Sequence, residues 1–138
     1  MPARDLFHNA VRHALEKDDW TITHDPLHVR ITTIDFYIDL GAEKLIAAER
    51  SGEKIAVEVK SFLGASTISD FYVALGQFIP YREALLEKEP ERVLFLAVPA
   101  DTYSSFFEQR FIQKIITQQA LKLLIYDEQK EVIKAWIP

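Results

Sequence analysis

Ile55-Ala56-Val57-Glu58-Val59-Lys60 is the most informative segment of the sequence. Its apolar residues predict a buried strand, but Glu58 and Lys60 stand two positions apart near its end. Strand side chains alternate between the two faces, so both should point the same way. Charged side chains are rarely buried without a partner. The pair therefore indicates either a salt bridge on a half-solvated sheet face or a site where the carboxylate binds a hard cation and the lysine orients a water molecule.

An aspartate from an adjacent strand would complete such a cation site. Residues 34–40 are apolar with Asp35 and Asp39 interspersed, and these two aspartates share strand parity. We prefer Asp39 because it sits nearer the end of the strand, and Asp35 is the alternative. The expected cofactor is Mg²⁺ or Mn²⁺, because hard divalent cations take oxygen ligands and a metal-bound water is a better nucleophile.

The composition is that of an ordinary soluble protein. The chain has 138 residues, of which 49% are hydrophobic and 27% are charged, and we predict a single domain over residues 1–138. Cysteine is absent, which excludes disulfides, thiolate zinc sites and a cysteine nucleophile. Neither a membrane span nor a signal peptide is recognisable, so we expect a cytoplasmic protein. The net charge of −5 argues against a general nucleic-acid coat but not against a nuclease with acidic metal ligands.

Hydrophobic periodicity predicts a chain of helices and strands. The expected helices cover residues 4–17, 69–88 and 100–119, and the expected strands cover residues 20–22, 43–50, 53–60, 93–98, 121–126 and 131–137. Ser51-Gly52 is a suitable hairpin turn. Ser69 or Thr67 should cap the second helix, which Pro80 should kink or locally open. This order of elements predicts an α/β sandwich with a mixed central sheet flanked by helices.

The combination of Asp39, Glu58, Val59 and Lys60 resembles the motif of the PD-(D/E)xK phosphodiesterase superfamily, which has the restriction-endonuclease-like fold. The resemblance implies that the two carboxylates hold one or two Mg²⁺ ions and that the lysine helps to position the attacking water. It also implies that the backbone carbonyl of Val59 is an additional metal ligand. The sequence departs from the motif at Ile38, where the superfamily has a proline.

Gln77 and Tyr81 form a QxxxY pattern on the second predicted helix. Residues four apart share a helix face, and the pattern resembles an accessory motif of nucleases related to RecB-type enzymes, which implies contact with substrate. The alternative is an ordinary amphipathic helix. Some relatives, including archaeal Holliday-junction resolvases, carry a metal-site glutamate on the first helix. Here His8 or Ala10 falls near that position, while Glu16 lies toward the helix end and is a poorer candidate, so this ligand is expected to be absent.

The whole chain resembles a narrower family. The phrases that carry the resemblance are HNAVRHALEKDDWTITHDPL, YIDLGAEKLIAAER, KIAVEVKSF and FYVALGQFIPYR, which are similar to the XisH family, known as fdxN element excision controlling factors in cyanobacteria. The resemblance implies a role in programmed excision of a DNA element, alongside a recombinase and a partner called XisI.

Two functions follow as hypotheses. One is a Mg²⁺-dependent DNA endonuclease, expected to be a homodimer. The other is a non-catalytic accessory factor that keeps the nuclease fold and binds DNA, the recombinase or the XisI-type partner. A toxin or antitoxin role would need genomic context.

Three other groups of side chains have both a structural and a functional interpretation. The histidines are expected at the surface or in structural roles: His8, His13, His24 and His28. Basic residues of the predicted hairpin could touch phosphates, although a solvated face explains them equally well: Lys44, Arg50 and Lys54. Aromatic residues at helical spacing indicate a core or a subunit interface: Phe106, Phe107 and Phe111.

Overall fold

The computed structural model describes residues 3–36 and 45–138. It contains a six-stranded sheet in the order β1-β4-β5-β6-β7-β8 and a two-stranded sheet formed by β2 and β3. The helices are α1 (Ala3–Lys17), α2 (Thr67–Lys88), α3 (Ala100–Thr102), the π-helix η1 (Tyr103–Phe107) and α4 (Arg110–Gln118). The strands are β1 (Thr21–His24), β2 (Val29–Ile31), β3 (Ile34–Phe36), β4 (Leu45–Arg50), β5 (Glu53–Val59), β6 (Arg92–Pro99), β7 (Leu123–Asp127) and β8 (Val132–Ile137).

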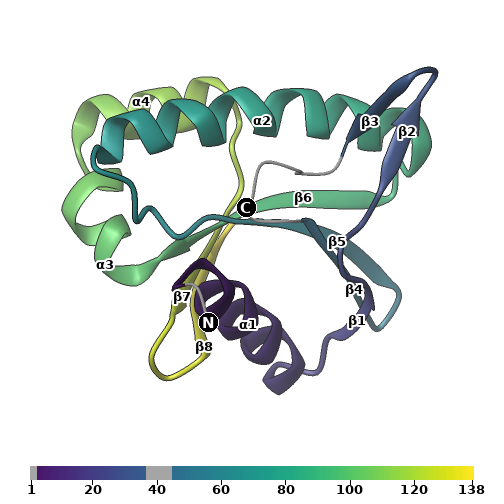
Figure 1. Cartoon of the computed structure of the whole chain (residues 1–138), viewed down its shortest axis with the longest axis horizontal. Coiled ribbons are helices and arrows are strands. Elements are labelled where there is room, and N and C mark those ends of the chain that lie inside the picture. The colour runs from purple at the N-terminus through teal and green to yellow at the C-terminus, as the bar shows by residue number, and fades with distance from the viewer. Residues whose placement is uncertain (1–2, 37–44) are drawn as a thin grey trace.

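Helices cover both faces of the six-stranded sheet, with α2 and α4 on one face and α1 on the other (Figure 1). The pairs β5–β6 and β6–β7 are parallel and the other pairs are antiparallel, which confirms the predicted mixed sheet. Parallel neighbours need crossover connections, and α2 and the α3–η1–α4 segment supply them. Two apolar clusters fill the layers: the α2-side cluster, which includes Ala56 and Phe71, and the α1-side cluster, which includes Val11 and Val57.

The β4–β5 hairpin fixes which face of the sheet each side chain meets. Ser51 and Gly52 have positive φ angles of 50° and 83°, a combination that suits the tight turn of a twisted hairpin. The predicted turn is therefore confirmed. Because Ala56 belongs to the α2-side cluster and Val57 to the α1-side cluster, the alternation of side chains turns Glu58 toward α2.

Helix α2 begins two residues before the predicted start. Its N-cap is Ser66, whose backbone is extended and whose hydroxyl accepts a hydrogen bond from the Ser69 amide at 3.3 Å. The prediction of Ser69 or Thr67 as the cap is therefore wrong, because only Ser66 combines the extended backbone with an oxygen that reaches the first turn. The helix continues through Pro80 to Lys88.

The segment predicted as one helix over residues 100–119 is interrupted. Gln109 has an extended backbone (φ −61°, ψ 138°) and separates η1 from α4. The side-chain amide of Gln113 donates a hydrogen bond to the Phe107 carbonyl at 2.6 Å, which satisfies one acceptor at the break. Phe107 is fully buried. The Phe107 ring thus reaches the core where η1 replaces a regular α-helix and the helix breaks at Gln109. Helical periodicity in the sequence does not predict this break.

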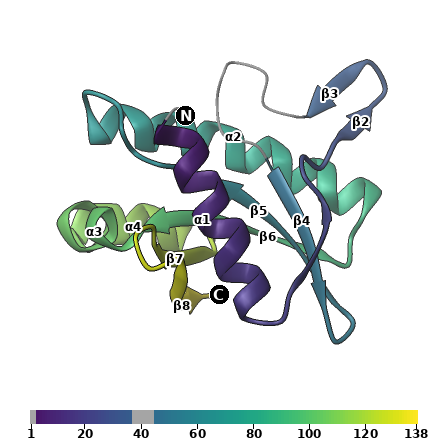
Figure 2. The same cartoon turned by 60° about the horizontal axis from the view of Figure 1, so that its bottom comes forward.

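The β2–β3 ribbon was not predicted. Its strands have three residues each, which is too short for a recognisable alternation of apolar and polar residues. Figure 2 shows the ribbon apart from the six-stranded sheet and close to α2. Leu27 and Val29 anchor this part of the chain in the α2-side cluster.

The longest helix among the described residues is α2, which has 22 residues and carries charged side chains within that length. Across residues 3–36 and 45–138, no helix combines the length and the apolar character needed to cross a membrane.

Candidate functional site

Glu58 and Lys60 are both buried at the end of β5. Glu58 has no exposed surface and Lys60 is 7% exposed. In the sheet, Glu58 stands between Leu45 of β4 and Leu96 of β6, so apolar strands flank it on both sides. The half-solvated face that a surface salt bridge would occupy is therefore not present. Burying two charged groups has a high desolvation cost, and such groups often mark a functional site.

Lys60 is held by three hydrogen bonds that fix its backbone and its side chain. Its amide donates to the Ala97 carbonyl at 3.2 Å, and its own carbonyl accepts from the Tyr126 hydroxyl at 3.1 Å. Its Nζ donates to Gln77 Oε1 at 2.5 Å. The ammonium group is thus aimed at α2 rather than at solvent, as the predicted shared face with Glu58 requires.

Gln77 and Tyr81 occupy the face of α2 that meets the end of β5. Gln77 contacts Lys60 directly, and Tyr81 is buried with 7% of its surface exposed. Burial, together with the negative charge of Glu58, raises the pKa of Tyr81 far above its usual value. The phenol is therefore protonated at neutral pH and can donate a hydrogen bond. The structure brings four of the sequence-predicted site residues together: Glu58, Lys60, Gln77 and Tyr81.

The two candidate aspartate ligands of the predicted site are Asp39 and Asp35. Asp39 lies outside the described residues. Asp35 lies in β3, where it pairs with Arg30 in the two-stranded sheet, whereas the antiparallel neighbour of β5 is β4. The expectation that residues 34–40 form a strand beside β5 is therefore wrong for the described part of that segment, because short-range periodicity does not specify the strand partner.

The donor chemistry at the end of β5 fits a hard cation. The Glu58 carboxylate and the Val59 backbone carbonyl are oxygen ligands of the kind that Mg²⁺ and Mn²⁺ prefer. Within residues 3–36 and 45–138, no three His, Asp or Glu side chains gather closely enough to form a metal site by themselves. A ligand set that includes Asp39 remains a prediction.

Two residues that sequence reasoning missed hold the loop after Lys60: Phe62 in the loop itself and Asp70 in the first turn of α2. Phe62 has a left-handed backbone (φ 56°), and its ring packs edge-on against Phe107 with centroids 5.4 Å apart. Asp70 accepts a hydrogen bond from the Gly64 amide at 2.9 Å. These contacts tie the loop to η1 and to the first turn of α2, so they fix the path of the chain out of the site. Gly64 in a loop was the one sequence signal that could have pointed to them.

The first helix contributes a structural cluster. His8 Nε2 and Asp25 Oδ1 are 2.8 Å apart, and Arg12 Nη1 donates to Asp25 Oδ2 at 2.8 Å. Burial alone would raise the pKa of the Asp25 carboxyl, but the hydrogen bonds and positive charge from His8 and Arg12 outweigh it and lower that pKa. The structural interpretation of His8 is supported. Ala10 is fully buried and Glu16 is exposed, so neither is placed like a metal ligand.

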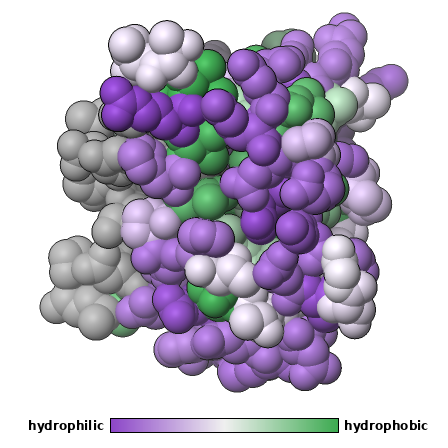
Figure 3. All heavy atoms as spheres, turned by 90° about the vertical axis from the view of Figure 1, so that its right-hand side faces the viewer, coloured by the Kyte–Doolittle hydropathy of each residue, from purple (hydrophilic) through white to green (hydrophobic). Residues whose placement is uncertain are grey.

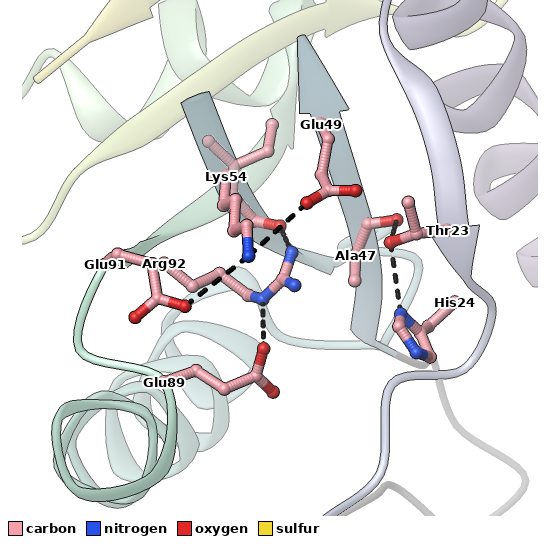
Figure 4. A network of polar contacts seen from close by, with 9 residues as sticks. Thr23, His24, Ala47, Glu49, Lys54, Glu89, Glu91 and Arg92 are labelled. Atoms are coloured by element: carbon pink, nitrogen blue, oxygen red, sulfur yellow. Dashed lines mark hydrogen bonds and ion pairs between the residues drawn. The ribbon is translucent and has the colours of Figure 1, made fainter. Parts of the chain in front are cut away.

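Two basic residues of the hairpin, Arg50 and Lys54, have protein partners. Arg50 lies over the Trp20 ring at 4.4 Å and forms an ion pair with Asp18 at 3.0 Å. Lys54 lies 3.6 Å from both Glu49 and Glu91 (Figure 4). These contacts favour the structural interpretation over phosphate contact.

The same region contains a buried arginine. Arg92 Nε donates to Glu89 at 2.9 Å (Figure 4), and its Nη1 donates to the Ile55 carbonyl at 3.0 Å.

Figure 3 shows that hydrophilic side chains cover most of the right-hand side of the molecule as drawn in Figure 1, with apolar side chains exposed in small patches. Lys44 lies outside the described residues.

The three phenylalanines of the predicted 100–119 helix have different environments. Phe107 is fully buried and Phe106 packs against the α2-side cluster, which confirms a core role for these two. Phe111 is 67% exposed, so the core interpretation is wrong for it.

Comparison with known proteins identifies close relatives over nearly the whole length. Residues 1–134 match a family model described as XisH protein. The crystal structure of an XisH family protein from Nostoc punctiforme PCC 73102 is 54% identical, with a TM-score of 0.90, and the match covers 97% of this chain and 100% of that one. The crystal structure of an fdxN element excision controlling factor protein from Anabaena variabilis is 53% identical, also with a TM-score of 0.90, and the match covers 98% of this chain and 100% of that one. No curated protein matches the chain significantly.

Proposed function

The chain belongs to the XisH family, and we propose that it takes part in programmed excision of a DNA element. The relative from Anabaena variabilis is named an fdxN element excision controlling factor, and the similarity extends over nearly all of both chains. We propose further that the protein is endonuclease-like, has the restriction-endonuclease-like fold of the PD-(D/E)xK superfamily, and hydrolyses DNA phosphodiester bonds with Mg²⁺.

The observation that carries the nuclease proposal is the buried pair of Glu58 and Lys60 beside Gln77. A carboxylate with no exposed surface and an ammonium group oriented at 2.5 Å by an amide oxygen form a preorganised polar site within an apolar sheet. Structural ion pairs can also be buried, but they are often no more stabilising than apolar residues of similar size. A polar arrangement of this kind is therefore better explained by chemistry than by stability.

Each residue has a role in this proposal. Asp39, Glu58 and the Val59 carbonyl would hold the divalent cation, which when bound supplies a Lewis acid for the charge that develops on the phosphate. Lys60 positions the attacking water, and Gln77 fixes the direction of its ammonium group. Because Gln77 uses its carbonyl oxygen for Lys60, its NH₂ group, which has no acceptor among the described residues, remains to donate to a phosphate oxygen. Tyr81 is a second neutral donor on the same helix face.

Metal-dependent melting combined with DNA cleavage tests this proposal. Wild type and Glu58→Gln would be melted with and without Mg²⁺ or Mn²⁺, and supercoiled, linear and branched DNA would be incubated with the same samples. We expect metal to raise the melting temperature of wild type by mass action and to permit nicking, with both effects lost in Glu58→Gln. The matched control is Glu53→Gln, which removes an exposed carboxylate from the same strand and should behave like wild type. Nicking that survives Glu58→Gln would refute the assignment.

An accessory role without catalysis is the second candidate. The net charge of −5 and the engagement of Arg50 and Lys54 by protein partners leave little basic surface for DNA on the described hairpin. In this role the chain would act through an XisI-type partner or a recombinase. The same experiment separates the two candidates, because an accessory protein would show neither metal stabilisation nor nicking.

We propose a homodimer for the nuclease, because two active sites can cut both strands of a duplex in one binding event. Sedimentation or light scattering of the purified protein measures the oligomeric state, and a monomer at all accessible concentrations would contradict this part of the proposal.

A further inference from the structure

Helix α4 presents a stripe of basic, aromatic and neutral polar side chains to solvent. Two of its isoleucines, Ile112 and Ile116, are buried in the α2-side cluster, and this fixes which side of the helix faces outward. Residues three and four apart share a helix face. The exposed side chains that follow this spacing form the α4 stripe: Arg110, Phe111, Lys114, Thr117 and Gln118. The helix contains no aspartate or glutamate, so the stripe has no negative charge of its own.

The cations of the α4 stripe are not neutralised by carboxylates. The sequence from residue 109 to residue 122 contains Arg110, Lys114 and Lys122 but no acidic residue. Among the described residues, neither Arg110 nor Lys114 has an ion-pair partner, whereas the two described basic residues of the β4–β5 hairpin do. The nearest acid before the stripe, Glu108, precedes the break at Gln109. A chain of net charge −5 therefore has a locally positive surface here.

Arg82 of α2 brings positive charge to the far end of α4. Its Nη1 donates to the Gln119 carbonyl at 2.7 Å and to the Ala120 carbonyl at 3.2 Å, so the guanidinium lies where α4 ends. Lys122 lines the same cavity as Arg82. At 1.5 Å per residue, the helix separates Arg110 from this end by about 13 Å. Positive charge thus occurs along the whole length of α4, as the track of a nucleic-acid backbone requires.

Phe111 supplies an open aromatic surface within the positive charge. Its side chain is 67% exposed, and no aromatic ring or guanidinium of the described residues lies against it. Arg110 precedes it directly and Lys114 lies one turn further along the same stripe. Proteins bind single strands by combining an exposed ring, on which a base stacks, with cations that meet the phosphates.

Ring contacts connect the start of the α4 stripe to the proposed nuclease site. Phe107, three residues before Arg110, packs on Phe62 of the loop after Lys60 with centroids 5.4 Å apart. Helices α2 and α4 lie on the same face of the sheet (Figure 1), which is the face toward which Glu58 points. A strand held on α4 would therefore lie on the same side of the sheet as the nuclease site.

We propose that the α4 stripe binds single-stranded DNA. The inference rests on the DNA role proposed above, but not on metal binding or catalysis. A duplex offers phosphates but keeps the faces of its bases inside the stack, so it would leave Phe111 unused. A second copy of the chain fits less well, because a two-fold interface brings the same patch of both copies together. Arg110 and Lys114 of the two copies would then meet without a carboxylate between them.

Fluorescence anisotropy of a labelled oligothymidylate of about 20 nucleotides, longer than a typical single site, measures this binding. Titration in EDTA removes divalent cations, so the result is independent of the metal site and of cleavage. We expect saturable binding that weakens as salt is added, because binding releases counterions from the phosphates. An unlabelled duplex of the same length is the competitor, and it should compete about tenfold less well because its bases are not free to stack.

Variants of the stripe separate stacking from charge. Phe111→Ala should weaken binding about tenfold through loss of stacking, whereas Phe111→Tyr keeps a ring and should retain binding. Lys114→Gln should weaken binding and lower the slope of log Kd against log salt concentration by about 0.7. The matched charge control is Lys134→Gln, which removes an exposed cation from β8 and should change neither quantity. Circular dichroism and melting verify that the variants fold, as expected for exposed positions.

Four outcomes would overturn the proposal. They are duplex competition equal to that of the single strand, unchanged binding in folded Phe111→Ala and Lys114→Gln, an equal loss in Lys134→Gln, and a wild type that binds duplex but not the single strand. A wild type that binds neither would overturn the DNA role as well. Dissociation of a dimer by Phe111→Ala with DNA binding unchanged would identify the stripe as a subunit interface instead. Binding that depends on Phe111 in a protein that never nicks DNA would support the stripe while the nuclease proposal fails.

Discussion

Lys60 and Gln77 are joined by a hydrogen bond of 2.5 Å between Nζ and Oε1, although one ends a central strand and the other lies two to three turns into α2. This bond connects two motifs that the sequence shows only as separate patterns. Lys60 is 7% exposed, so its ammonium group depends on protein acceptors rather than on water. The relationship therefore makes Gln77 part of the support of the buried charge as well as a candidate substrate contact.

Replacing Gln77 by leucine should destabilise the fold. The variant keeps a side chain of similar size but removes the Oε1 acceptor of Lys60, and we expect the free energy of unfolding to fall by about 1–3 kcal/mol. Urea denaturation at neutral pH measures the change. Glu83→Gln is the control, because Glu83 is exposed on the same helix and its substitution should leave the midpoint nearly unchanged. Equal midpoints for all three proteins would show that the bond does not contribute to stability.

Two glycines should respond in opposite directions to alanine. A Cβ at Gly64 would lie 2.5 Å from Asp70 Oδ1, so Gly64→Ala must displace the carboxylate that accepts the Gly64 amide and should cost about 1 kcal/mol. A Cβ at Gly76 meets nothing within 4 Å, and Gly76→Ala in α2 should stabilise by about 0.5–1 kcal/mol, because alanine loses less backbone entropy. Thermal melting compares the pair, and a stabilising Gly64→Ala would contradict the described loop geometry.

Asp25 should make the fold sensitive to acid. Its pKa is lowered in the folded state from the ordinary 3.8, so the unfolded state binds the proton more readily. The stabilisation from Asp25 is therefore present above pH 3.8 and is lost as the pH falls through the lower folded pKa. Asp25→Asn should be less stable than wild type at neutral pH, and the gap should narrow in acid. Melting curves across the acidic range measure the gap, with the exposed Asp101→Asn as the control. A constant gap would contradict the proposed charge interaction.

Tyr81 should make the fold sensitive to alkali. Its pKa is raised above the ordinary value of 10.0 by burial and by Glu58, so the unfolded state loses the phenolic proton first. The stabilisation is therefore complete below pH 10.0 and declines as the pH rises toward the folded pKa. Tyr81→Phe should flatten the alkaline fall in stability, whereas Tyr72→Phe, at a position 62% exposed, should not. Alkaline melting series distinguish the two variants, and identical slopes for them would count against the interaction with Glu58.

Much of the local structure is predictable because its causes are local. The Ser51-Gly52 turn needs only residues that tolerate positive φ, and the pairing of Glu58 and Lys60 on one face needs only strand alternation. The N-cap of α2 is harder to predict, because Ser66, Thr67 and Ser69 are all chemically suitable. The choice of Ser66 depends on where the chain leaves the β5–α2 loop, which the contact of Gly64 with Asp70 helps to fix.

The buried strand, the hairpin, α1, α2 and the family can all be recognised in the amino-acid sequence, since each follows from spacing, turn chemistry or the order of residues. The full burial of Glu58, the break of the 100–119 segment at Gln109 and the contact between the Trp20 and Trp136 rings become evident only in the folded chain. Propensity and periodicity act between neighbours along the chain. Burial and contact between distant segments depend instead on the order of the strands in the sheet and on which helix covers each face.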